Sequence, residues 1–200
     1  MKLLYFSLKG GVGKSSIALN HALYEEYAYI TNDISTTVDA EYVPDFHQIP
    51  PNSKRIPKKL LAYEDAIYDF GAMSSAIDAK VTHAVLECDG VIIPTLTDQR
   101  SLEATIKTYK LIQEKARRII IIINNYTNNR KFDYAYDYLY EHLPEPIILD
   151  IRTTTLFERV ARDGVEWFDN VGHSKGEYQL LKTKEKHNEI YRTIQMLMKG

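Results

Sequence analysis

The 200-residue chain has a formal net charge of −2, with 44% hydrophobic and 26% charged residues, which is ordinary for a globular protein that buries its own core. Its single cysteine, Cys88, excludes an internal disulfide framework and a multi-cysteine metal site within one chain. The chain has no apolar run of about 18 residues, which argues against a membrane-spanning helix. We therefore expect one cytoplasmic domain over residues 1–200.

Short apolar segments alternate with longer segments of helical periodicity along the chain. Strands are predicted at residues 2–7, 28–31, 66–70, 90–95, 118–124 and 146–151, and helices at 15–27, 73–85, 100–116 and 132–143. Continuous apolar strands that alternate with helices are typical of a parallel sheet covered on both faces. The predicted fold class is α/β, a mostly parallel sheet with helices on both sides.

Residues 34–63 depart from this alternation. Four prolines in the segment (Pro44, Pro50, Pro51 and Pro57) prevent a long regular helix. We expect an irregular surface excursion between the second and third strands.

The C-terminal segment, residues 177–200, spaces Tyr191, Ile194, Leu197 and Met198 along one helical face. A membrane-surface helix would present such a stripe, but the polar face here mixes acidic and basic residues and lacks a strong basic bias. We expect the stripe to pack on the sheet.

Charge is distributed unevenly between the two halves of the chain. Residues 1–99 hold 8 Lys/Arg and 13 Asp/Glu, a net charge of −5, whereas residues 100–200 hold 17 and 14, a net charge of +3. The second half could therefore present a modest basic face to a polyanion, and ordinary solvated helix faces would give the same count.

The stretch KGGVGKS, residues 9–15, follows the first strand and opens the first helix, which is the context of a phosphate-binding loop. Glycines in such a loop let backbone N–H groups approach phosphate oxygens, and the helix N-terminus adds further donors. The expected cofactor-binding residues are Gly10, Gly11, Val12, Gly13, Lys14, Ser15, Ser16 and Asn124.

Five side chains have expected roles at the ends of strands or at the helix start. Lys14 would reach the β- and γ-phosphates, and the Ser15 hydroxyl would ligate Mg²⁺. Asp69 ends a strand and would hold an Mg²⁺-bound water. Asp33 follows the second strand at the sheet edge where ligands bind, and would orient an attacking water. Asn124 closes the strand at 118–124, where it would hydrogen-bond a base or serve as a turn residue.

From Lys9 onward this stretch resembles the deviant Walker A motif of the ParA/MinD family of ATPases, whereas Leu8 replaces the first glycine of the general pattern. Later segments resemble the family in the same order. ITNDIS is similar to its D-x-D element, with Thr31 in place of the first acid and Asp33 as the second. AIYDFGA resembles the Walker B strand, and DGVIIPTLTDQRSLEATIKTYKLI resembles the strand and helix that follow. DIRTTTLFERVARDGV resembles a late segment in which a turn precedes a helix that ends in glycine.

The resemblance implies a small ParA-type protein, a weak Mg²⁺-dependent ATPase that forms a homodimer with ATP at the interface. In this family the early lysine, here Lys9, crosses to the phosphates bound by the partner. A cation supplied in this way would neutralise charge in phosphoryl transfer only after the dimer has formed. The implied catalytic residues are Lys9, Lys14 and Asp33, and the resemblance makes Lys9 a cofactor-binding residue as well.

Two functions fit this resemblance. The first is DNA partitioning of a plasmid or chromosome, in which the ATP-bound dimer binds nonspecific DNA and a ParB-like partner stimulates hydrolysis. The candidate DNA contacts are Arg152, Arg159, Lys182, Lys184 and Lys186. The alternative is a MinD-like positioning ATPase that acts on a membrane surface or a polar protein complex. Metal-cluster ATPases of the same superfamily need paired cysteines, which this chain lacks.

Overall fold

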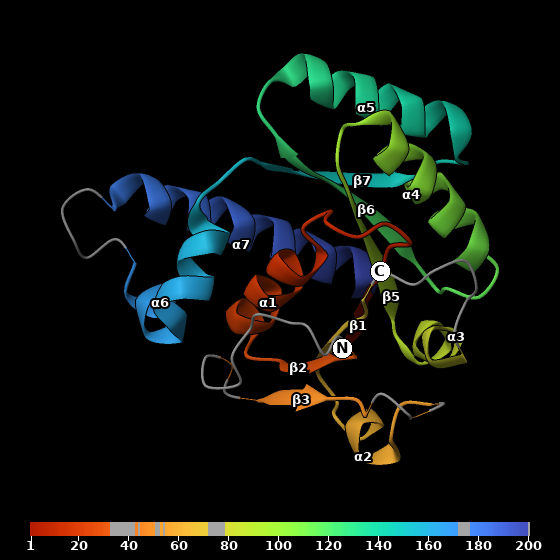
Figure 1. The fold of residues 1–200 in the computed structure, drawn as a ribbon, viewed down its shortest axis with the longest axis vertical. Helices are drawn as coiled ribbons and strands as arrows, with labels where there is room; N and C mark the ends of the chain where they lie inside the picture. Colours follow the sequence, from red (N-terminus) through yellow and green to blue (C-terminus); the bar gives the residue numbers. More distant parts are fainter. Residues whose placement is uncertain are drawn as a thin grey trace.

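The computed structural model describes residues 1–32, 43, 45–50, 53, 55–71, 79–171 and 177–199 (Figure 1). Within them, seven parallel strands form one sheet in the order β3-β2-β4-β1-β5-β6-β7. The strands are β1 (Lys2–Tyr5), β2 (Ala28–Thr31), β3 (Phe46–Gln48), β4 (Ala66–Asp69), β5 (Gly90–Thr95), β6 (Ile119–Tyr126) and β7 (Ile147–Arg152). The predicted parallel sheet is confirmed, and each of the six predicted strands has its counterpart.

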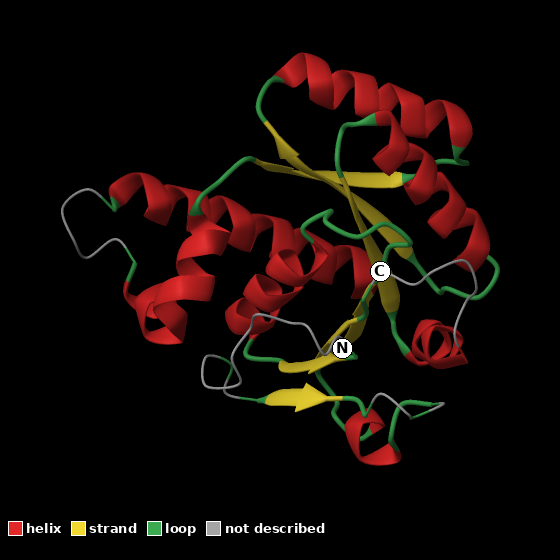
Figure 2. Cartoon of the chain, in the orientation of Figure 1, coloured by secondary structure: helices red, strands yellow, loops and turns green. Residues whose placement is uncertain are grey.

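Helices cover both faces of the sheet (Figure 2). The helices are α1 (Lys14–Glu25), α2 (Lys58–Leu61), α3 (Ala79–Glu87), α4 (Gln99–Ile112), α5 (Asn129–His142), α6 (Leu156–Asn170) and α7 (Tyr178–Lys199). Helices α1, α6 and α7 contact one another on one face, and α4 packs on β5 and on α5 at the other. The alternation of strands and helices therefore gives the two-sided architecture that the sequence predicts.

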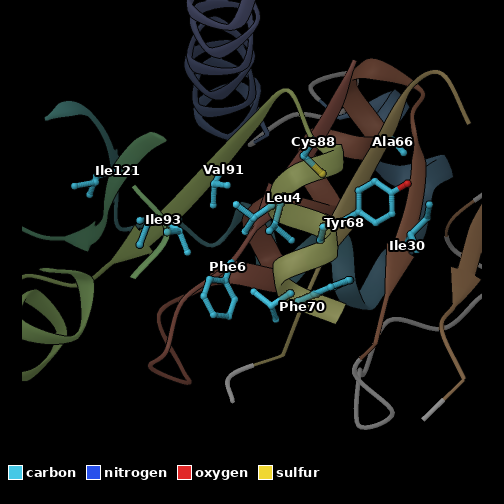
Figure 3. Packing of buried hydrophobic residues seen from close by; sticks show 14 of the residues in the cluster. Leu4, Phe6, Ile30, Ala66, Tyr68, Phe70, Cys88, Val91, Ile93 and Ile121 are labelled. Atoms are coloured by element: carbon cyan, nitrogen blue, oxygen red, sulfur yellow. The ribbon is translucent and has the colours of Figure 1, made fainter. Parts of the chain in front are cut away.

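Two hydrophobic clusters lie on opposite faces of the sheet. Along β1 and the residue that follows it, Leu3 and Tyr5 belong to the cluster under α1, whereas Leu4 and Phe6 belong to the other, part of which Figure 3 shows. Successive side chains of a strand point to opposite faces, so a strand covered on both sides must be apolar throughout. This double burial explains why the strand segments read as continuous apolar runs.

Helix α7 packs its apolar stripe against the sheet. Tyr191 and Ile194 are buried, and Leu197 and Met198 pack on the same cluster as α1. A side chain at Gly90, the first residue of β5, would overlap the thioether of Met198. The predicted packing is thus confirmed, and these residues are not displayed for a membrane surface. None of the described helices combines the length and apolar character needed to cross a bilayer.

Residues 34–63 are not wholly irregular, as the sequence analysis expected. The described part of this segment contains the edge strand β3 and the short helix α2. The prolines allow both elements because Pro50 follows β3 and Pro57 is the residue before α2, where a missing N–H costs no helical hydrogen bond.

Helix boundaries differ from expectation in two places. The helix α6 runs through Gly164 to Asn170, so the expectation of a helix that ends at this glycine is wrong. The helix predicted at 73–85 is described from Ala79 to Glu87, and residues 72–78 lie outside the described part of the chain.

Candidate nucleotide-binding site

The phosphate loop connects β1 to α1 at the carboxyl edge of the sheet. Gly11 and Gly13 have left-handed backbone conformations, with φ of 73° and 79°. Gly13 precedes the first helical residue, and its carbonyl accepts a hydrogen bond from Ile17 N at 3.1 Å. Strand β1 lies between β4 and β5, where the strand order reverses, and ligands of open parallel sheets bind at this point. The loop therefore presents the α1 N-terminus at the expected ligand position.

The entrance of the loop is fixed by hydroxyl groups. Leu8 N donates to Thr108 Oγ1 of α4 at 3.2 Å, and Lys9 N donates to Ser7 Oγ at 3.3 Å. Beyond these bonds, Lys9 is half-buried and Gly10 and Gly11 are exposed. The backbone before Lys9 is thus tied to α4, while the glycines that follow face solvent.

Lys14 and Asp69 form a buried ion pair beneath the loop. Lys14 Nζ lies 2.6 Å from Asp69 Oδ1, and the exposed fractions of the two residues are 7% and 0%. Residues Lys2 to Tyr5 of β1 pair with Ala66 to Asp69 of β4, which brings the ends of both strands together. The phosphate-loop lysine and the predicted Walker B acid are therefore direct neighbours.

Tyr29 is the second partner of Asp69, and the sequence analysis missed it. Its hydroxyl donates to Asp69 Oδ2 at 2.7 Å, and its ring stacks on Phe46 of β3 with centroids 6.0 Å apart. A tyrosine in a buried strand signals a polar tip that needs a partner, but the sequence could not identify that partner.

Asn124 contacts the phosphate loop from the end of β6. Its Nδ2 atom donates to the Val12 carbonyl at 3.1 Å, and both residues are buried. A Cβ atom on Gly13 would overlap the Asn124 amide. The structure therefore brings Asn124 to the expected site, where it holds the loop backbone.

A pocket of about 190 Å³ opens beside the loop. Its lining residues are Gly11, Gly13, Ser16, Leu96, Asn124, Asn125, Arg152, Thr154, Phe157 and Glu158. The last four come from the end of β7 and the start of α6, and the sequence analysis did not assign them to this site. Their positions at the carboxyl edge, after a predicted strand, were the signal that could have identified them.

Arg152 is the exposed cation of this pocket. Its Nε donates to Tyr126 OH at 3.3 Å, its Nη2 contacts Asn129 Oδ1, and its guanidinium lies 5.4 Å from the centroid of the Tyr126 ring. These interactions hold Arg152, one of the residues expected to contact DNA, beside the phosphate loop.

The donor chemistry at the site fits a magnesium ion. The Ser15 side chain is half-buried at the first turn of α1, and the Asp69 carboxylate lies at the end of β4. Hydroxyl and carboxylate oxygens are hard ligands, and Mg²⁺ commonly takes one or two of them together with substrate phosphates and water. Ser16 is exposed at the same helix start and lines the pocket.

The D-x-D element is described only at its start. Thr31 is buried at the end of β2 and pairs in register with Asp69 of β4. Asp33 lies outside the described residues, so its role in orienting a water stays a prediction.

Asp98 provides a negative charge near Lys9. Its carboxylate caps α4 by accepting a hydrogen bond from Ser101 N at 3.1 Å. Hydrogen bonds from Ser101, together with the positive charge of Lys9, lower the pKa of Asp98. The cation at the loop entrance therefore has an acidic neighbour on the β5–α4 connection.

The other expected DNA contacts have different surroundings. Arg159 pairs with Asp163 at 3.2 Å and with Glu177 at 3.7 Å. Lys184 contacts the Phe168 carbonyl, and burial lowers its pKa. Lys182 and Lys186 are exposed on α7, and the Lys182 Nζ atom lies 4.6 Å from the centroid of the Tyr178 ring. The expected DNA contact of each of these residues stays a prediction.

No protein-family model and no curated protein sequence matches this chain. Solved structures do. A ParA family ATPase from Chlorobium tepidum TLS has a TM-score of 0.61 and 21% identity, with 94% of this chain and 96% of that chain covered. A protein named as a plasmid partition protein from Borrelia burgdorferi B31, bound to AMPPNP, has a TM-score of 0.61 and 16% identity, with 84% of this chain and 95% of that chain covered.

The septum site-determining protein MinD from Pyrococcus horikoshii OT3, complexed with Mg-ADP, has a TM-score of 0.57 and 16% identity, with 92% of this chain and 94% of that chain covered. At identities this low, the likeness establishes the fold. The sheet order and the phosphate loop agree with it, and the chain has the fold of the ParA- and MinD-type P-loop ATPases.

Proposed function

We propose that this chain is an ATP- and Mg²⁺-dependent ATPase that dimerises on ATP and partitions DNA, with hydrolysis stimulated by a partner protein. The observation that carries the proposal is the buried Lys14–Asp69 pair directly beneath a glycine loop that begins with Lys9. Two solved structures of this fold hold AMPPNP and Mg-ADP, which supports the same class of ligand here.

ATP binding would redirect Lys14. Its Nζ atom contacts Asp69 Oδ1 at 2.6 Å, and it would turn to the β- and γ-phosphates, to which the loop N–H groups and the α1 N-terminus would also donate. The pocket beside Asn124 and Arg152 would receive the base and ribose. Mg²⁺, held by Ser15 and by a water on Asp69, would neutralise phosphate charge. Asp33 would orient the attacking water.

Lys9 would act on the partner subunit. It lies five positions before Lys14, so the two lysines lie at opposite ends of the loop. A second cation, delivered across the interface, would stabilise the charge of the transferred phosphoryl group only in the dimer. The nucleotide charge then becomes part of the interface, and dimerisation depends on the γ-phosphate.

Sedimentation of the purified chain with ADP or AMPPNP, each with and without DNA, tests the proposal. We expect a dimer with AMPPNP and Mg²⁺ and a monomer with ADP. The dimer alone should bind nonspecific DNA, with an affinity that falls steeply between low and moderate salt because binding rests on phosphate contacts. DNA binding without nucleotide, or no DNA binding at all, would refute the partitioning function.

Two lysine variants separate the roles within the loop. Lys14→Ala should abolish nucleotide binding, whereas Lys9→Ala should bind ATP like the parent and fail to dimerise or hydrolyse it. If Lys9→Ala dimerises and hydrolyses ATP at the parental rate, the lysine does not act in the partner's site.

A further inference from the structure

We propose that Tyr29 is a positioning residue for Asp69, and that its hydroxyl keeps the carboxylate oriented toward the magnesium-bound water when Lys14 turns to the phosphates. The inference rests on the proposed function, because it assumes that Lys14 binds phosphate and that Asp69 serves Mg²⁺. The experiment below is chosen so that the two can fail separately.

The two oxygens of Asp69 have different partners. Oδ1 contacts Lys14 Nζ at 2.6 Å, and Oδ2 accepts from the Tyr29 hydroxyl at 2.7 Å. The carboxylate is fully buried, so an oxygen that loses its partner is not resolvated by bulk water. When Lys14 moves to a phosphate, the bond from Tyr29 is the one of these two that stays.

The position of Tyr29 suits a fixed donor. The strand β2 pairs with β4 so that Tyr29 lies opposite Ile67 and Thr31 lies opposite Asp69. Side chains two residues apart in a strand point to the same face, so Tyr29 shares the face of Thr31. Because Thr31 is in register with Asp69, Tyr29 lies on the same face as Asp69, two residues earlier along the strands. Its hydroxyl therefore reaches the carboxylate along this face of the sheet.

The Tyr29 ring is also held in place. It is fully buried, and it stacks on Phe46 of the edge strand β3 at an interplanar angle of 26°. A side chain locked by packing keeps a functional group in the required orientation better than a mobile one does. The edge strand thus supports the site through Phe46 and Tyr29.

Tyr29→Phe removes the hydroxyl and retains the ring. The measurement is the affinity of the full-length chain for a fluorescent ATP analogue, first in EDTA and then across a Mg²⁺ titration. We expect the half-saturating Mg²⁺ concentration to rise about tenfold, because a hydrogen bond to a charged group contributes on that order. The affinity in EDTA should stay within about twofold of the parent, since the Tyr29 hydroxyl donates to Asp69, which acts on the nucleotide through Mg²⁺.

Tyr5→Phe is the matched control. Tyr5 is equally buried on β1, and its hydroxyl is hydrogen-bonded to His21 Nδ1 at 2.8 Å. This variant should lose stability to a similar extent and leave the Mg²⁺ titration unchanged. A Tyr29→Phe titration that matches that of Tyr5→Phe, or a loss of affinity that is equal with and without Mg²⁺, overturns the positioning role.

Two further variants keep the result interpretable. Phe46→Leu loosens the support of the Tyr29 ring and leaves the hydroxyl present, so it should raise the half-saturating Mg²⁺ concentration by less than Tyr29→Phe. It also provides the test if Tyr29→Phe does not fold, and a parental titration would then refute the inference.

Asp69→Asn should abolish the gain in affinity for the ATP analogue that Mg²⁺ gives the parent. If the parent shows no such gain, the magnesium role within the proposed function fails, and the role of Tyr29 fails with it.

Discussion

Gly11 and Gly13 have nearly the same backbone conformation and very different surroundings. Both φ angles lie in the left-handed region, where a side chain costs about 1–2 kcal/mol. A Cβ atom on Gly11 would meet nothing within 4 Å, whereas one on Gly13 would overlap the Asn124 amide. The two glycines therefore separate the backbone cost of an alanine from its steric cost.

We predict that Gly11→Ala lowers the free energy of unfolding by about 1–2 kcal/mol and that Gly13→Ala lowers it further. Urea denaturation of the two variants measures the difference. In an Asn124→Ala background the overlap is absent, so the cost of Gly13→Ala should fall to that of Gly11→Ala. An equal cost of Gly13→Ala in both backgrounds would show that Asn124 is not the obstacle.

Single residues were predictable where their role follows from local sequence. Lys14 and Ser15 follow from a strand, a glycine loop and a helix in succession, and Asp69 follows from a strand that ends in an acid. The contacts of Asn124 with Val12 and of Tyr29 with Asp69 join segments that are distant in sequence. No local pattern encodes such a contact, because it depends on which strands become neighbours in the sheet.

Among the elements, α7 gives the clearest link between pattern and packing. Ile194 is fully buried in the cluster shared with α1, and Met196 on the same helix is 67% exposed. The stripe could be predicted from helical spacing, but the spacing alone does not identify the surface that covers it, since membrane and sheet both bind apolar faces. The mixed charge of the polar face favours packing on the sheet, because a membrane-surface helix would have a strong basic bias.

We predict that Ile194→Ala lowers the free energy of unfolding by about 2–5 kcal/mol, because it leaves a cavity between α7 and the sheet. Met196→Ala on the exposed face should change it by about 0.5 kcal/mol or less. Chemical denaturation of both variants provides the comparison. If the two variants lose similar stability, α7 is not packed on the sheet as described.

The strand β3 and the extension of α6 were not predictable for a physical reason. The sequence Phe-His-Gln is short and has a single apolar residue, so it lacks the apolar run of a central strand, and among the described strands β3 pairs only with β2. Gly164 disfavours a helix by only about 1 kcal/mol, which packing of the rest of α6 offsets. Tertiary contacts decide such weak local preferences.

At the scale of the whole molecule, the fold class followed from the alternation of apolar strands with helices. That alternation also places the strand ends at one edge, which is why residues predicted separately, Lys14, Asp69 and Asn124, lie around one loop. The order of the strands could not be read from the sequence, because parallel strands of similar composition are interchangeable in pattern. The order determines which side chains meet, including the Tyr29–Asp69 pair.

Two buried histidines couple the stability of the whole molecule to pH. His21 on α1 stacks on Tyr191 of α7, and burial lowers its pKa to about 3. His187 on α7 stacks on Phe157 of α6, and burial lowers its pKa to about 4. Both rings link helices on the same face of the sheet, so protonation of either would place an uncompensated charge inside this layer.

We predict that the free energy of unfolding falls as the pH drops from about 6.5 toward 4. Between the lowered pKa of the folded state and the ordinary pKa near 6.5 of the unfolded state, unfolding takes up a proton at each histidine, so stability rises with pH. By about pH 5, each histidine should lower the free energy of unfolding by about 2 kcal/mol relative to its value at neutral pH. Urea denaturation at several pH values gives the free energy of unfolding as a function of pH. The slope of this dependence should be shallower by about 1.4 kcal/mol per pH unit in His21→Gln and in His187→Gln. The double variant should lose both contributions, and a parental dependence on pH in the double variant would show that neither ring is buried in its neutral form.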